Sequence, residues 1–111
     1  MLKYKNFLGK VTYDDDAKIL HGEVVGLNDV ITFQAKDTNT IEKEFKASIN
    51  DYLAFCKEEG RDPEKSVSGE TRIRMGEERH LLVSKVSQAN DISMNDWLNE
   101  AIDAKIEKEV S

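Results

Sequence analysis

Two arginines at alternate positions of Thr71–Met75 have the spacing that best suits a binding chemistry. Side chains of a strand alternate between its two faces, so Arg72 and Arg74 would share one face while Ile73 and Met75 share the other. A two-stranded ribbon fits the major groove of DNA, where an arginine donates paired hydrogen bonds to a guanine edge. The pattern therefore predicts a DNA-binding strand that pairs with its copy from a second chain.

Other residues that could carry chemistry are better explained without it. Asp14, Asp15 and Asp16 are adjacent, so they project in different directions, and they are typical of a solvated turn rather than of a metal site. The two histidines, His21 and His80, are not accompanied by a catalytic motif. We predict no enzyme activity, no cofactor and no metal.

Two amphipathic helices are predicted to follow the arginine strand. The first has an apolar stripe of Leu82, Val86 and Ala89, widened by Leu81 and Val83, and the second has apolar residues at helical spacing over a longer stretch. One strand and two helices are too small to bury this much apolar surface alone, which favours an obligate dimer. The predicted core and dimerisation residues are Ile73, Met75, Leu82, Val86, Trp97, Leu98 and Ile102.

The N-terminal half has a β pattern from Leu2 to Lys36, in which three apolar runs are separated by polar turns. A helix should follow, capped by Thr38 or Asn39 and ended by Gly60. We predict a three-stranded antiparallel sheet covered by one long helix, an α+β arrangement. Its core is small for independent stability, so self-association is expected here too.

Composition sets the boundaries of the interpretation. Charged residues make up 34% and hydrophobic residues 39% of the 111 residues, and no apolar run is long enough to span a membrane. The N-terminus lacks a signal-peptide pattern, and the single cysteine, Cys56, lies on an apolar helix face, so the cytoplasm is the expected compartment. The net charge is −6, which means that DNA would be bound by a local basic patch.

The segment from Gly69 to Glu107 resembles the ribbon-helix-helix repressors, the family of Arc, MetJ and CopG, by its strand-helix-helix order and length. Carried over to this chain, that resemblance places Arg72 and Arg74 on the DNA-reading face, with Glu70 at its edge. It places Ser93 and Asn95 at the start of the second helix, where free backbone N–H groups would hold a DNA phosphate. Gly76 and Glu77 stand where the family often has Ser or Thr and then Pro, so the first helix is expected to lack a side-chain cap.

Nearly the whole chain resembles the HicB antitoxins. The pieces that carry this likeness include Gly9-x-Val11-x-Tyr13-Asp14, Leu20-His21-Gly22-Glu23-Val24, Asp29-Val30-Ile31-Thr32-Phe33, Asp51-Tyr52-Leu53-x-Phe55-Cys56 and Ser93-Met94-Asn95-Asp96-Trp97. The resemblance implies an N-terminal sheet-and-helix domain, likened to a partial RNase H fold, that blocks the active site of a HicA-type RNA-cleaving toxin. It also implies a C-terminal domain that represses the operon of the pair.

The partial RNase H fold that this resemblance implies suggests one enzymatic alternative, an RNase H-type enzyme. Such chemistry needs dispersed carboxylates around Mg²⁺, and Asp14, Glu23 and Asp51 are the candidates. The chain is short for a complete site of this kind.

These expectations give residues 1–62 as a toxin-binding domain, 63–69 as a linker and 70–111 as a ribbon-helix-helix domain. The expected partners are a HicA-type toxin, operator DNA and a second copy of the chain through the C-terminal domain, with a tetramer as a further option. An orphan DNA-binding regulator without a toxin is the alternative. Guesses for the toxin contacts are Asp14, Asp15, Asp16, Asp29, Ile31 and Phe33.

Overall fold

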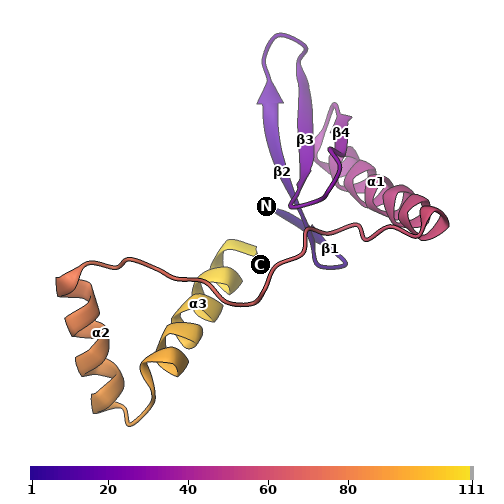
Figure 1. Cartoon of the computed structure of the whole chain (residues 1–111). Helices are drawn as coiled ribbons and strands as arrows, with labels where there is room; N and C mark the ends of the chain where they lie inside the picture. The colour runs from indigo at the N-terminus through magenta and orange to yellow at the C-terminus, as the bar shows by residue number, and fades with distance from the viewer. Residues whose placement is uncertain (111) are drawn as a thin grey trace. The chain divides into compact units, whose positions relative to one another are not determined.

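The computed structural model describes residues 1–110, which form an antiparallel sheet of four strands and three helices. Two compact units follow one another along the chain, residues 1–66 and residues 67–109, and each is described by itself. No helix in the described part of the chain has the length and apolar character needed to cross a bilayer. The elements, which are labelled in Figure 1, are β1 (Leu2–Tyr4), β2 (Phe7–Asp14), β3 (Ile19–Val25), β4 (Thr32–Ala35), α1 (Thr38–Glu59), α2 (Glu77–Ala89) and α3 (Met94–Val110).

The sheet of the first unit has the strand order β1-β2-β3-β4, with every neighbouring pair antiparallel. The predicted α+β class and antiparallel sheet are confirmed, but the prediction of three strands was wrong. The additional strand, β1, is joined to β2 by a two-residue turn at Lys5 and Asn6, whose φ angles are 50° and 66°. A lysine is not a typical residue for a left-handed turn position, so this tight hairpin was not visible in the sequence.

Helix α1 packs on one face of the sheet, and the strand residues that alternate onto that face form the core with it (Figure 1). Phe45 and Ile49 of α1 are almost completely buried. The opposite face carries mainly polar side chains and is exposed, as expected for an antiparallel sheet covered on one side. The buried residues of this core are Phe7, Val24, Leu27, Phe33, Ala35, Ile41, Phe45, Ile49, Tyr52 and Cys56.

Two glycines make room for the aromatic centre of this core. The ring of Phe33 packs directly over Gly22, and a Cβ atom on Gly9 would lie 2.7 Å from the Cε1 atom of Phe45. The two rings contact each other with their centroids 5.2 Å apart. Any side chain at either glycine would overlap an aromatic ring, so the strands depend on these residues for close approach of the helix.

The ends of α1 only partly match the prediction. Asp37, and not Thr38 or Asn39, is the N-cap, because its carboxylate Oδ1 accepts a hydrogen bond of 2.7 Å from the Thr40 backbone N–H. The spacing that pointed to Asn39 placed the cap too far into the helix. Gly60 ends the helix in the left-handed conformation, as predicted.

The second unit consists of α2 and α3, joined by a short connection. As expected, Gly76 precedes α2 without a side-chain cap. The predicted strand Thr71–Met75 is not in a strand among the described residues. A strand exists only where a neighbour completes its hydrogen bonds, and the predicted neighbour is a second chain. The ribbon itself stays a prediction.

Substitution of Gly22 by alanine is expected to lower the free energy of unfolding by about 1–3 kcal/mol, because the new methyl group overlaps the Phe33 ring. Urea denaturation of the purified protein measures this loss. Phe33→Leu added to Gly22→Ala should cost less than the sum of the two single changes, since a smaller side chain vacates the overlapped space. Strictly additive losses would show that the ring does not set the requirement for glycine.

Candidate partner and DNA interfaces

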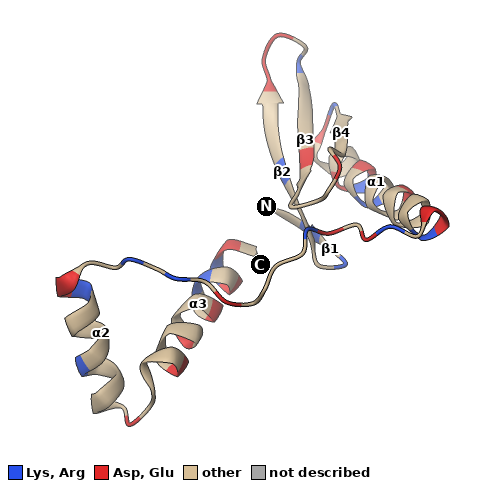
Figure 2. Cartoon of the chain, viewed as in Figure 1, with Lys and Arg blue, Asp and Glu red and all other residues tan. Residues whose placement is uncertain are grey.

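The two arginines before α2 are exposed, and no carboxylate in residues 1–110 lies within ion-pair distance of either. Figure 2 shows positive charge along this segment and acidic residues in the first turn of α2. Arg72 and Arg74 are therefore free to bind an external acceptor. Glu70 is also exposed, and its backbone N–H is bonded to the Ser68 hydroxyl.

The start of α3 has the local geometry that the sequence predicted. Ser93 Oγ accepts a hydrogen bond of 3.0 Å from the Asp96 backbone N–H, which caps the helix. Ser93 and Asn95 are both exposed. Asp96 lies in the first turn and is acidic, so the positive end of the helix is partly compensated within the chain itself.

The apolar side chains of the second unit are mostly uncovered in the single chain. Only Val83 and Ser87 are buried among the described residues from 67 to 110, and the Ser87 hydroxyl is satisfied by donating to the Val83 carbonyl oxygen at 2.8 Å. Leu82 is 58% exposed and Ile73 is 55% exposed. An apolar surface of this kind on a small helical unit marks an interaction site. Val86 and Ile102 of the predicted core are also exposed, while Met75, Trp97 and Leu98 are half-buried.

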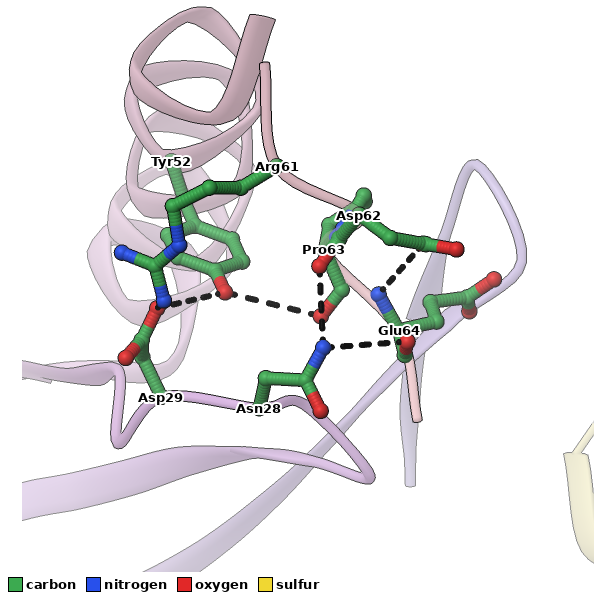
Figure 3. Close-up of polar contacts among 7 residues, drawn as sticks. All are labelled: Asn28, Asp29, Tyr52, Arg61, Asp62, Pro63 and Glu64. Atoms are coloured by element: carbon green, nitrogen blue, oxygen red, sulfur yellow. Dashed lines mark hydrogen bonds and ion pairs between the residues drawn. The ribbon is translucent and has the colours of Figure 1, made fainter. Parts of the chain in front are cut away.

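A second candidate surface lies in the first unit, where the connection between β3 and β4 meets the end of α1 (Figure 3). Asp29 Oδ2 accepts two hydrogen bonds, one of 2.9 Å from the Tyr52 hydroxyl and one of 2.7 Å from Arg61 Nη2. The Tyr52 hydroxyl lowers the pKa of Asp29 below its ordinary value, and the Arg61 guanidinium lowers it further. Burial is the main cause of a raised pKa at Tyr52. Asp29 is therefore ionised and Tyr52 neutral at physiological pH.

The segment that follows α1 is held against the same connection. The side-chain amide of Asn28 donates to the carbonyl oxygens of Asp62 and Glu64, at 2.9 and 3.2 Å (Figure 3). The Lys65 backbone N–H donates to the Gly26 carbonyl oxygen. The first unit extends to residue 66, and three residues of the segment expected to be a linker, Pro63, Glu64 and Lys65, are hydrogen-bonded to the sheet domain.

These contacts border a groove with a volume of about 540 Å³. Its floor is largely aromatic and apolar. Phe55 is 45% exposed, its ring stacks near Tyr52 with a centroid separation of 6.5 Å, and the Arg61 guanidinium lies 5.6 Å from its centre. Two carboxylates, Asp29 and Asp51, lie at the rim against one guanidinium, so the groove has a net negative charge. The lining residues are Asp29, Ile31, Ser48, Asp51, Tyr52, Phe55 and Arg61.

The residues guessed as toxin contacts are dispersed over the first unit. Asp29 and Ile31 line the groove, whereas Asp14 is the last residue of β2 and Asp15 and Asp16 lie in the exposed turn that follows it. Asp14 Oδ1 accepts the backbone N–H groups of Asp16 and Ala17, so this carboxylate shapes the turn. Phe33 is buried in the core and is not available to a partner.

Sequence reasoning did not find the groove itself. Arg61 lies just before the segment expected to be a linker, beyond the predicted end of the helix, and Phe55 lies off the buried stripe of α1, so neither gave a periodic signal. The three carboxylates of the RNase H alternative are not gathered. Asp51 is on α1, whereas Glu23 is on the sheet face that α1 does not cover, and residues 1–110 contain no cluster of potential metal ligands.

Tyr52→Phe removes the hydroxyl that bonds to Asp29 and is expected to lower the free energy of unfolding by about 1 kcal/mol at neutral pH. The pKa of Asp29 is lowered in the folded state, so its stabilising contribution is present above its ordinary pKa and is lost as the pH falls through the folded value. The difference between the wild type and Tyr52→Phe should therefore shrink in acid. Urea denaturation at a series of pH values tests this, and a difference independent of pH would contradict it.

Comparison with known proteins gives one family. Residues 52–102 match the model of the HicB family, from the last two turns of α1 through the arginine segment and α2 into α3. No curated protein and no solved structure matches the chain. The matched stretch covers 51 of the 111 residues and includes Tyr52, Phe55 and Arg61 of the groove as well as both free arginines, so this part of the chain is similar to the HicB family.

Proposed function

We propose that this protein is an antitoxin that neutralises a HicA-type mRNA-cleaving toxin and represses its own operon. The match to the HicB family carries the proposal, because that family is consistent with a toxin–antitoxin role. Two surfaces of the chain suit the two tasks. One is the acidic, aromatic groove of the first unit, and the other is the segment with Arg72 and Arg74 beside the uncovered apolar side chains of α2 and α3.

DNA binding would begin with dimerisation. Pairing of Thr71–Met75 with the same segment of a second chain would cover Ile73 and the exposed side chains of α2, such as Leu82. The same pairing would place the arginines of both chains on the outer face of a ribbon, where they could read base edges. Ser93 and Asn95 would add a phosphate contact at the start of α3.

Toxin neutralisation would use the groove to occlude the toxin's active site. A small RNA-cleaving protein has a basic surface, and the groove offers two carboxylates around the exposed Phe55 ring. An exposed aromatic side chain in an apolar depression is the kind of residue that contributes most to a protein interface. Asp29 is already ionised and held by Tyr52 and Arg61, so the rim is organised before a partner binds.

The DNA-binding part predicts that Arg74→Ala lowers specific operator affinity by about 1–3 kcal/mol if this side chain reads a base. Arg72→Ala together with Arg74→Ala should abolish specific binding to DNA from upstream of the gene, measured by fluorescence anisotropy at fixed salt. Lys108→Ala, which removes an exposed positive charge near the end of α3, is the matched control. Unchanged affinity in the double variant, with its dimer intact, would remove the ribbon from the proposal.

The toxin-binding part predicts that Phe55→Ala weakens the complex with the toxin by about 30-fold, or 2 kcal/mol, as for a central interface aromatic. Calorimetry with the small basic protein encoded beside the gene measures this. Val25→Ala is the control, because it shortens an exposed apolar side chain on the opposite face of the sheet. Asp15→Asn with Asp16→Asn tests the acidic turn instead. Absence of such a neighbouring gene, with operator binding retained, would favour the orphan regulator.

A further inference from the structure

Strand β2 is longer than the strand that pairs with it on one side. Its residues Phe7–Gly9 pair with β1, whereas β3 pairs with it from Leu8 to Asp14. Within residues 1–110, the stretch Lys10–Asp14 therefore has a neighbour only on the β3 side. In Figure 1, β2 and β3 extend as a hairpin beyond β1. An unpaired strand edge of five residues is a template for pairing with another strand.

The free backbone groups of this edge can be identified from the register. The Val24 N–H donates to the Ile31 carbonyl oxygen at 2.9 Å, so the backbone groups of Val24 point toward β4 and away from β2. Gly9, which is opposite Val24, must then direct its own groups toward β1. Val11 and Tyr13 follow at intervals of two and share that direction. Their N–H and C=O groups therefore face the unpaired edge.

We propose that a second copy of this chain pairs with this edge, β2 against β2, in the antiparallel register centred on Thr12. In that register, Lys10 of one copy lies opposite Asp14 of the other. Val11 lies opposite Tyr13, and Thr12 lies opposite Thr12. The contact is isologous, because each copy offers the same five residues to the other.

The order of residues in Lys10–Asp14 fits its own copy in three ways. Two cross-strand ion pairs, two pairs of a β-branched with an aromatic residue and a central pair of threonines are all combinations that stabilise antiparallel strands. The backbone agrees with the side chains, since Val11 and Tyr13 both point to the edge and would exchange hydrogen bonds. A register shifted by one residue would place Val11 opposite Thr12, whose backbone groups point to β3.

The surroundings of this edge also fit a second strand. Tyr13 is 57% exposed, and Val11 is half-buried beside it, so pairing would cover apolar surface on the side of α1. Met1 precedes β1 in line with Lys10, so this arrangement requires Met1 to move aside for Asp14 of the other copy. The other edge of the sheet, β4, has no charged residue with which to select its own copy.

Because Thr12 would lie opposite Thr12 of the other copy, charged substitutions at this position test the proposed contact independently of the second unit. Thr12→Lys and Thr12→Glu each place like charges opposite one another at the centre of the contact. Each is expected to raise the dissociation constant for the contact by at least about fivefold. An equal mixture of the two variants places Lys opposite Glu and should restore the contact. Thr12 is exposed, so neither change disturbs the core.

Hydrogen exchange of the full-length protein at high and low concentration is the direct measurement. The Val11 and Tyr13 amides should be protected in the wild type at high concentration, unprotected in each single variant, and protected again in the mixture. Sedimentation equilibrium should show the matching changes in mass, on top of any association through the second unit. Gln34→Lys, an exposed charge added on β4, is the control and should retain protection.

Three results would overturn the proposal. The first is rapid exchange of both amides in the wild type at high concentration, a measurement that does not depend on the variants. The second is loss of protection in both variants without recovery in the mixture, which would show that Thr12 does not meet its own copy. The third is protection that appears only when the toxin is added, which would assign the edge to that partner.

Discussion

The packing of the Phe33 ring against two glycines is the contact on which the first unit depends. Gly22 leaves the space that the ring fills, and the ring then contacts Phe45 of α1. This contact fixes β4 beside β3 and sets where the connection before β4 can run. Asp29 belongs to that connection, and its bonds to Tyr52 and Arg61 attach the end of α1 to it. The groove is therefore a consequence of the core.

The second unit, unlike the first, has almost no buried core of its own. The first unit buries ten residues in its core, whereas the second has only Val83 and Ser87 buried among its described residues. Ser93 caps α3, whereas α2 has no side-chain cap, and secondary structure alone does not stabilise a helix pair of this size. Tertiary burial must come from outside this unit. Pairing of two chains would both form the proposed DNA-binding ribbon and bury the apolar side chains of the unit. DNA binding and the stability of the unit would therefore depend on the same contact.

The sequence predicted well where periodicity and local chemistry decide the structure. The stripe of Ile41, Phe45 and Ile49 placed α1, and Gly60 placed its end. The prediction failed where the signal was short or distant. The strand β1 has only three residues and follows an unusual turn, so it was missed.

The groove was missed for a different reason. Tyr52 and Arg61 follow Asp29 by 23 and 32 residues along the chain, and only the fold brings the three together. Tyr52 was correctly placed on the buried stripe, but its hydroxyl partner could not be read from any spacing. The family match includes Tyr52 and Arg61, but it starts at residue 52 and leaves Asp29 and the sheet outside.

Two isologous contacts on one chain would have a consequence that neither has alone. Pairing through Lys10–Asp14 has one two-fold axis, and pairing through Thr71–Met75 would have another. Such a chain closes into a tetramer only if the two axes are compatible, and otherwise it continues into an open array. Residues 67–76, which connect the bonded end of the first unit to α2, set the relation between the axes. An operator would hold two ribbons at a fixed spacing along DNA. It would therefore stabilise those assemblies in which residues 67–76 allow that spacing. Operator binding and pairing of the sheets would then be thermodynamically linked.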